Sequence, residues 1–102
     1  MTSGYYRSPT VHGDTIVFVC EDDLWSVSIE GGTAWRLTSN LGAAGFPRFS
    51  PDGESLAFTG QEDGPAEAYC MPSAGGEARR LTFQGEAVVA AWDPDGGSIL
   101  YS

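Results

Sequence analysis

The residues of this chain that could do chemistry are few, and their spacing gives no catalytic arrangement. His12 is the only histidine among the 102 residues, and it stands in the turn-like segment VHGD. Nucleophilic catalysis needs a nucleophile, a neighbouring base and a third group that orients the base. The spacing suggests no such serine, histidine and acid, and the GxSxG pattern does not occur. We assign no catalytic residue and expect His12 to face solvent in a turn.

Acidic residues gather in segments that superficially resemble metal-binding loops. Glu21-Asp22-Asp23 and Glu62-Asp63 are predicted to occupy the same loop of two successive repeats, but neither has the DxDxDG spacing of a calcium loop. Asp93-Pro94-Asp95-Gly96 has a counterpart in which Ser50 replaces the first aspartate. Turn formation alone explains acidic residues at such places. We therefore predict no metal site, with calcium binding as the minor alternative.

Cysteines and paired glycines give no sign of a cofactor. Cys20 and Cys70 have neither a CxxC pattern nor histidines beside them, and metal binding needs a denser cluster of ligands. We expect both to be reduced strand residues, with a disulfide as the alternative. Gly31-Gly32 and Gly75-Gly76 lack the strand, glycine and helix context of a phosphate-binding loop. The sequence thus predicts no cofactor.

The charge balance bears on partners and location. Fourteen acidic and five basic residues, all of the latter arginine, give a net charge of −9. A surface this acidic repels a phosphate backbone. No apolar run approaches the roughly 18 residues that span a bilayer, and no signal peptide is evident. We expect a cytoplasmic protein that binds neither nucleic acid nor membrane.

An internal repeat indicates how these residues are positioned. FPRFSPDGESLAFTG (46–60) returns as VAAWDPDGGSILYS (89–102), and GGTAWRLTS (31–39) returns as GGEARRLTF (75–83). Leu37 is followed by Leu81, a step of 44 positions. Periods of about 40–45 residues are typical of the four-stranded blades of β-propellers. The repeat therefore predicts an all-β propeller architecture.

Each unit divides into four short apolar segments separated by turn residues. In the second unit Pro51-Asp52-Gly53 supplies turn chemistry, and Gly75-Gly76 favours a tight hairpin between the third and fourth segments. No segment has a sustained helical period, so we predict almost no helix. The predicted strands of this unit are Phe46–Ser50, Ser55–Gly60, Ala66–Met71 and Glu77–Phe83.

Alternation predicts strands that are buried on both sides. Apolar pairs point to one face of each second strand, while residues such as Val17 and Ala57 make the opposite face apolar too. In the third strands, Trp25 and Val27 stand where Tyr69 and Met71 stand one unit later. The pairs on the first face are Ile16 with Phe18, Leu56 with Phe58, and Ile99 with Tyr101.

The count of units predicts a β-propeller fragment of about two and a half four-stranded antiparallel blades. Residues 1–102 form one partial propeller, with blade 1 at 5–39, blade 2 at 46–83 and the first half of blade 3 at 89–102. Propellers close with about four to eight blades. We expect the chain to be unstable alone or to find partners, either the remaining blades of a larger chain or other copies of itself.

The arginines are predicted to have two kinds of role. Arg36, Arg79 and Arg80 fall on outer strands, where charge blunts an exposed edge. Arg48 falls on a first strand, which in a propeller lines the central channel. There it could contact the carboxylates of passing peptides or pair with a neighbouring acid, and the ion pair is favoured.

The chain resembles the amino terminus of the tricorn protease family over nearly its whole length. The opening SPTVHGDTIVFVCEDDLW (8–25) points to this family, whereas SPDG followed by GGxxxRLT is shared with many TolB-like propellers. The resemblance implies the start of a six-bladed first propeller in a large cytoplasmic serine peptidase, a hydrolase that trims oligopeptides downstream of the proteasome. The family's catalytic serine, histidine and glutamate belong to carboxy-terminal domains, so no residue here receives those roles. The resemblance thus implies that the partners of this chain include the catalytic domains of a larger chain.

We weigh three hypotheses for the function of the chain. The leading one is a non-catalytic propeller fragment of a tricorn-like peptidase that serves peptide passage or assembly. The alternative is a TolB-like protein-interaction module unrelated to proteolysis. A propeller enzyme or sugar-binding lectin with a site at the blade ends is the third.

Overall fold

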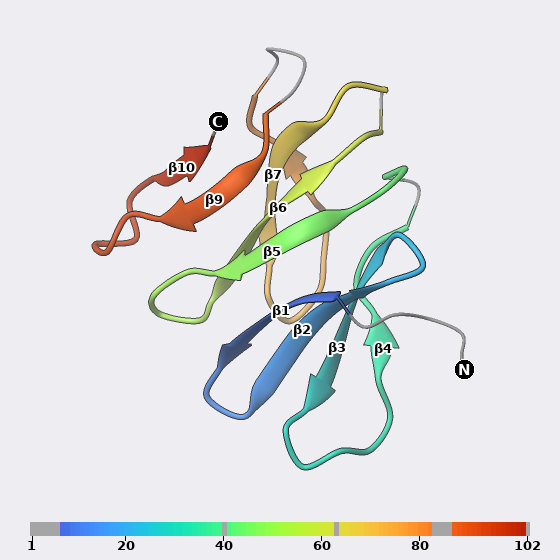
Figure 1. The fold of residues 1–102 in the computed structure, drawn as a ribbon. Coiled ribbons are helices and arrows are strands. Elements are labelled where there is room, and N and C mark those ends of the chain that lie inside the picture. The colour runs from blue at the N-terminus through green and yellow to red at the C-terminus, as the bar shows by residue number, and fades with distance from the viewer. Residues whose placement is uncertain (1–6, 40, 63, 83–86, 102) are drawn as a thin grey trace.

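The structure, a computed structural model, describes residues 7–39, 41–62, 64–82 and 87–101. Within these ranges the chain forms ten β-strands and no helix, as predicted. They make two four-stranded sheets and one two-stranded sheet, each with its strands in chain order (Figure 1). The predicted fold, two and a half four-stranded antiparallel blades, is confirmed. No helix of the described residues could cross a membrane.

The first two sheets are antiparallel meanders of the same design. In each, three strands of five or six residues are followed by a fourth strand of two residues. The first sheet consists of β1 (Arg7–His12), β2 (Thr15–Cys20), β3 (Asp23–Ser28) and β4 (Trp35–Arg36). The second consists of β5 (Gly45–Phe49), β6 (Ser55–Gly60), β7 (Glu67–Pro72) and β8 (Arg79–Arg80), and the third of β9 (Val89–Trp92) and β10 (Ile99–Tyr101).

Some strand boundaries differ from the prediction. β6 has the predicted bounds, but β8 is two residues long instead of covering Glu77–Phe83. The glycine pairs stand in six-residue connections, 29–34 and 73–78, and not in tight hairpins. All four of these glycines have positive φ, from 94° to 137°, a region that glycine enters without steric cost. Turn chemistry was therefore predicted correctly and connection length was not.

Two apolar layers hold the three sheets together. The layer between the first and second sheets contains Val17, Val19 and Leu24 from one side and Leu56, Phe58, Tyr69 and Met71 from the other. A smaller layer of Ala57, Ala68 and Val89 lies between the second and third sheets. Leu56, Ala57 and Phe58, which are consecutive and so alternate in direction, are all fully buried. The prediction that β6 is buried on both faces is confirmed.

The innermost strands of the three sheets lie next to one another. β5 contacts both β1 and β9, and Figure 1 shows β5 between these two strands. This is the arrangement of propeller blades around an axis. The sheets therefore define an inner side, formed by β1, β5 and β9, and an outer side, formed by the fourth strands.

Candidate functional site

A carboxylate, a threonine and an arginine form the same polar cluster in both complete sheets. In the first sheet these are Asp23, Thr38 and Arg36, here called the Asp23 cluster. The Thr38 hydroxyl donates to Asp23 Oδ1 at 2.8 Å and accepts from the backbone N–H of Leu24 at 3.0 Å. Arg36 Nη1 lies 3.8 Å from Asp23 Oδ2. The cluster thus ties the start of β3 to the segment after β4.

The Glu67 cluster, formed by Glu67, Thr82 and Arg80, repeats this geometry 44 residues later. The Thr82 hydroxyl donates to Glu67 Oε1 and accepts from the N–H of Ala68 at 2.9 Å. Arg80 Nη2 lies 3.4 Å from Glu67 Oε2, and its Nε–H donates to the Thr82 carbonyl at 2.9 Å. The recurring Arg-Leu-Thr of the sequence therefore satisfies a carboxylate on the neighbouring strand.

The two clusters differ in how far they are shielded from water. The side chain of Glu67 is 2% exposed and that of Arg80 22%, whereas Asp23 and Arg36 are 21% and 54% exposed. Glu67 pairs with Gly60, and Arg80 with Tyr69, which puts them on the face of the second sheet that packs against the first. The Asp23 cluster is on the matching face of the first sheet, which no described sheet covers.

These clusters add to one prediction and correct part of another. Arg36, Arg79 and Arg80 lie on the outer strands, as predicted, and Arg36 and Arg80 also bind carboxylates. As predicted, Glu21 and Asp22 lie in the link between the second and third strands of the first sheet, and Glu62 lies in the same link of the second sheet. Asp23 is instead the first residue of β3 and corresponds to Glu67, because this link has two residues in the first sheet and six in the second. Asp63 lies outside the described residues. The signal that sequence reasoning missed is an acid 13 positions before each Arg-Leu-Thr.

The turn between β5 and β6 organises Asp52. Its Oδ1 accepts hydrogen bonds from the Ser50 hydroxyl at 2.7 Å and from the backbone N–H of Glu54 at 2.9 Å. The backbone bond from Glu54 and the bond from Ser50, with a smaller contribution from the His12 charge, lower the pKa of Asp52 below its ordinary value. In the third sheet Asp95 likewise accepts from the N–H of Gly97 at 2.8 Å. Both turns are explained without a metal.

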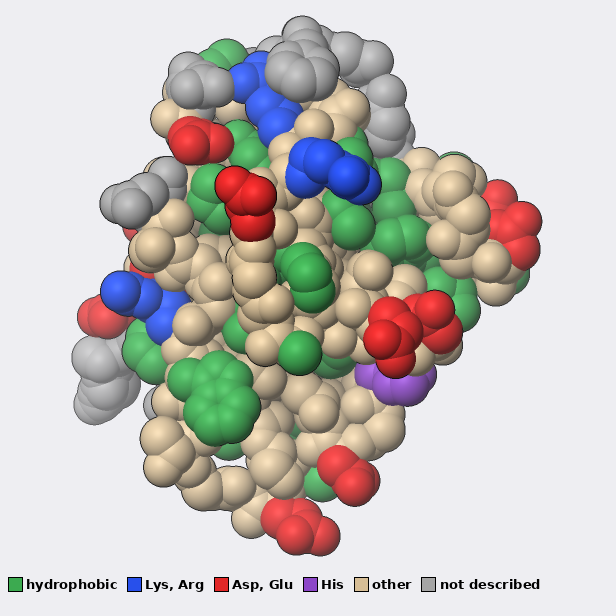
Figure 2. Space-filling view, turned by 180° about the vertical axis from the view of Figure 1, so that it is seen from behind, with side chains coloured by type: hydrophobic (Ala, Val, Ile, Leu, Met, Phe, Trp, Pro, Cys, Tyr) green, Lys and Arg blue, Asp and Glu red, His purple; other side chains and the backbone are tan. Residues whose placement is uncertain are grey.

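His12 lies against the second sheet as well as being exposed to solvent. Its ring centroid is 5.8 Å from that of Phe49, and a Cβ added to Gly53 would overlap the imidazole. Figure 2 shows the histidine (purple) directly beside acidic side chains. His12 and Ser73 line one cleft. The Ser73 hydroxyl donates its hydrogen bond to the Gly53 carbonyl at 2.6 Å and not to the histidine. The histidine therefore has a packing role between two turns.

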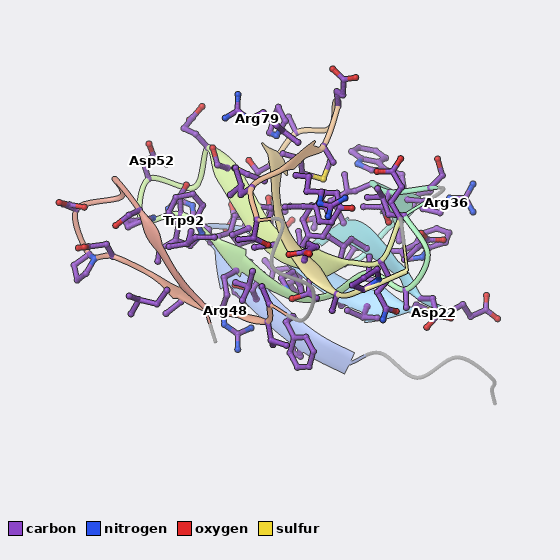
Figure 3. All side chains as sticks on the ribbon, turned by 90° about the horizontal axis from the view of Figure 1, so that it is seen from above. Asp22, Arg36, Arg48, Asp52, Arg79 and Trp92 are labelled. Atoms are coloured by element: carbon purple, nitrogen blue, oxygen red, sulfur yellow. The ribbon has the colours of Figure 1, made fainter. Side chains whose placement is uncertain are left out.

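Arg48 is half-buried on β5. Its Nη1 donates to the carbonyl of Pro47 at 2.8 Å, and its own carbonyl accepts from Trp92 Nε1 at 2.8 Å. Figure 3 shows Arg48 on the side of the molecule where β1 runs, opposite Arg79. Its role in lining a channel, and the choice between a peptide carboxylate and an acidic neighbour, stay predictions.

No metal-binding group is found where the structure describes the chain. Residues 7–39, 41–62, 64–82 and 87–101 contain no set of three His, Cys, Asp or Glu side chains that could hold an ion. Cys20 and Cys70 are both unpaired cysteines in the structure, each partly buried. Burial raises the pKa of the Cys70 thiol above its ordinary value, which disfavours the reactive thiolate.

Two complete four-stranded meanders and half of a third, stacked flank to flank with their inner strands together, define the chain as part of a β-propeller. A solved structure of a putative TolB from Agrobacterium tumefaciens has the same arrangement, with a TM-score of 0.87 and 25% identity. The match covers 98% of this chain and 38% of that one.

The chain belongs to the tricorn protease N-terminal beta propeller domain family, whose model matches residues 3–102. It is 46% identical over 102 residues to putative tricorn protease homolog 2 of Streptomyces coelicolor, covering 94% of this chain and 9% of that protein. A crystal structure of the tricorn protease matches 93% of this chain and 10% of its own, with 33% identity and a TM-score of 0.82. The chain thus spans about a tenth of the tricorn proteins it matches.

Proposed function

We propose that the chain is a non-catalytic, blade-stacking part of a propeller in a tricorn-type peptidase that degrades oligopeptides downstream of the proteasome. In this proposal 5–39, 46–83 and 89–102 are successive blades, and the peptidase works in the cytoplasm. Membership of the tricorn propeller family supports the protease context. The chain's own contribution is then assembly of the propeller and passage of peptides along its inner side.

The main support for the proposal is a difference in exposure between equivalent faces of the first and second sheets. Tyr69 and Met71 of the second sheet are 1% and 2% exposed because the first sheet covers them. Their counterparts Trp25 and Val27, on the matching flank of the first sheet, are only half-buried. At the other end Leu100 is 59% exposed. Each end therefore offers an apolar flank that suits another blade, from a longer chain or from a second copy.

Complementation tests this function. The matched 100 residues would be deleted from tricorn protease homolog 1 of Streptomyces coelicolor, and hydrolysis of a fluorogenic oligopeptide would be measured with and without the present chain. We expect no hydrolysis by the chain alone and recovery of activity on mixing. Turnover by the chain alone that a serine-directed inhibitor abolishes would refute the non-catalytic role.

A TolB-like interaction module is the second candidate, favoured by the TM-score of 0.87 to the TolB structure. The same experiment separates the two. An interaction module would bind partner proteins without restoring peptide hydrolysis, whereas a tricorn blade set restores it.

A further inference from the structure

A cleft lies at the edge of the apolar layer between the first two sheets and shares Val19 and Ala44 with that layer. Its volume is about 310 Å³, at the lower end of the roughly 300–1,000 Å³ of ligand pockets. Val19, Ala44 and Val88 give it apolar walls, while Asp22, Phe46 and Gln61 supply its larger polar and aromatic side chains. A cleft of this size suits one or two amino-acid residues and not a long segment.

Phe46 is held in a strained conformation at this cleft. Its φ is 52°, in the left-handed region where a bulky residue is an outlier. The pairing of β5 with β6 shifts register between Gly45 and Arg48, so Phe46 lies within an irregularity of the innermost strand. The side chain is 47% exposed. Strain of this kind gathers at ligand-binding positions.

Asp22 brings a negative charge to the same cleft. Its backbone carbonyl accepts from the N–H of Ala44 at 2.8 Å, which fixes the turn against the loop before β5. Where the structure describes the chain, no hydrogen bond or ion pair occupies the Asp22 carboxylate. With a net charge of −9 on the chain, this carboxylate favours a cation and repels an anion.

We propose that the cleft binds the amino-terminal residue of an oligopeptide. The ammonium group pairs with Asp22, the first side chain packs against Phe46 and the apolar walls, and the Gln61 amide contacts the first peptide group. This inference rests on the proposed passage of peptides and gives that passage a polarity. An apolar wall beside a carboxylate matches an apolar residue with a free amino group.

The test uses a short peptide that begins with leucine and carries a fluorophore near its carboxyl end. Its binding to the full chain is followed by fluorescence anisotropy and compared with that of the N-acetylated peptide. Because a charge-assisted hydrogen bond contributes about 1.5–3 kcal/mol, acetylation is expected to weaken binding about tenfold or more. This comparison needs no altered protein.

Two variants and a control locate the site. The φ of Asp22 is 69°, and asparagine tolerates such a positive φ. Asp22→Asn therefore keeps the turn and is expected to abolish the preference for the free amino group. Glu21→Gln, which changes the neighbouring charge outside the cleft lining, should keep that preference. Phe46→Gly relieves the left-handed strain while it removes the ring, so it is expected to stay folded and bind more weakly.

Equal binding of the free and acetylated peptides, or an unchanged preference in Asp22→Asn, would overturn the inference. So would the absence of any binding by the parent chain. None of these results bears on whether the chain restores hydrolysis in the complementation experiment, so failure of this site and failure of the proposed function are distinguishable.

Discussion

At the residue scale, one threonine hydroxyl in each complete sheet forms two hydrogen bonds, one as acceptor and one as donor. Thr38 and Thr82 each accept a backbone N–H and donate to a carboxylate. A buried donor or acceptor left unpaired costs about 1–3 kcal/mol. Because the side chain of Glu67 is 2% exposed and that of Asp23 is 21%, the same substitution should have unequal effects.

Thr82→Val is expected to lower the free energy of unfolding by about 2–3 kcal/mol, since it removes one hydrogen bond to Glu67 and leaves the Ala68 N–H unpaired. Thr38→Val should lower it by about 1 kcal/mol, because water reaches the Asp23 cluster. Urea titration of both variants checks this. Equal losses would contradict a role for shielding.

Gly53 needs both its backbone conformation and its missing side chain. Its φ is 77°, and a Cβ would overlap His12. Gly53→Ala should destabilise by about 2 kcal/mol, from the left-handed cost and displacement of the imidazole from Phe49. Gly13→Ala, with a φ of 57° and open space around it, should lose only about 1 kcal/mol.

A double-mutant cycle isolates the contribution of His12. In the His12→Ala background, Gly53→Ala should cost only about as much stability as Gly13→Ala costs in the parent chain. Thermal unfolding measures both losses. If the losses simply add, the imidazole does not limit the space at Gly53.

The lowered pKa of Asp52 predicts an effect of acid. A group whose pKa is lower in the folded state contributes stability above its unfolded pKa of about 3.9, and that contribution is lost as pH falls through the folded value. We expect the Asp52 carboxyl carbon to titrate below this value by NMR. Asp52→Asn should flatten the fall of the unfolding midpoint below about pH 4. An unchanged acid profile would contradict this.

At the element scale, the third sheet is attached to the second by an indole. Trp92 Nε1 donates to the carbonyl of Arg48 across the gap between β9 and β5. The backbone N–H of Val89 adds a bond to the Thr59 hydroxyl at 3.0 Å. The two bonds position β9 beside the inner strand of the preceding sheet.

Trp92→Phe keeps an aromatic ring and removes the donor, so it should destabilise the chain by about 1 kcal/mol and lower the protection of β10 amides in hydrogen exchange. Trp25→Phe is the matched control. Trp25 Nε1 is buried and has no hydrogen-bond partner within the described residues, so its removal should cost less. A larger loss for Trp25→Phe would contradict the assigned roles.

Elements with strong local signals were predictable from the sequence. Alternation and the turn at 51–53 predict β6 correctly because both signals are local. Asp23 was grouped with the loop residues Glu21 and Asp22 because the acidic run does not show where the link ends and the strand begins. Its true counterpart, Glu67, follows a link of six residues instead of two. The polar clusters escaped prediction for a related reason: the acid and its Arg-Leu-Thr come together only once the register of three strands is known.

At the scale of the whole molecule, the cleft could not be predicted because its lining comes from four separate connections and strands of different sheets. The left-handed backbone of Asp22 and Phe46 marks it, and φ is not visible in a sequence. The stacking of sheets was predictable because strands apolar on both faces need a neighbour on each side.

The open flank of the first sheet predicts self-association of the chain. Val27 pairs with Ile16 on that flank, and Val27→Lys should lower the sedimentation coefficient at high protein concentration, because charge disfavours apolar contact. Thr33→Lys, in an exposed connection, should leave association unchanged. A parent chain that sediments as a monomer at every concentration and melts cooperatively would contradict the prediction.

The Asp23 and Glu67 clusters each close within a single sheet, and this has a consequence for how such proteins evolve. A duplicated unit of 44 codons would carry the carboxylate together with its threonine and arginine, so the carboxylate of the new copy would already be paired. Only the apolar faces of the new sheet must then fit the apolar faces of its neighbours. Rings of different size can therefore arise by copying or losing whole units, while selection refines the surfaces between them.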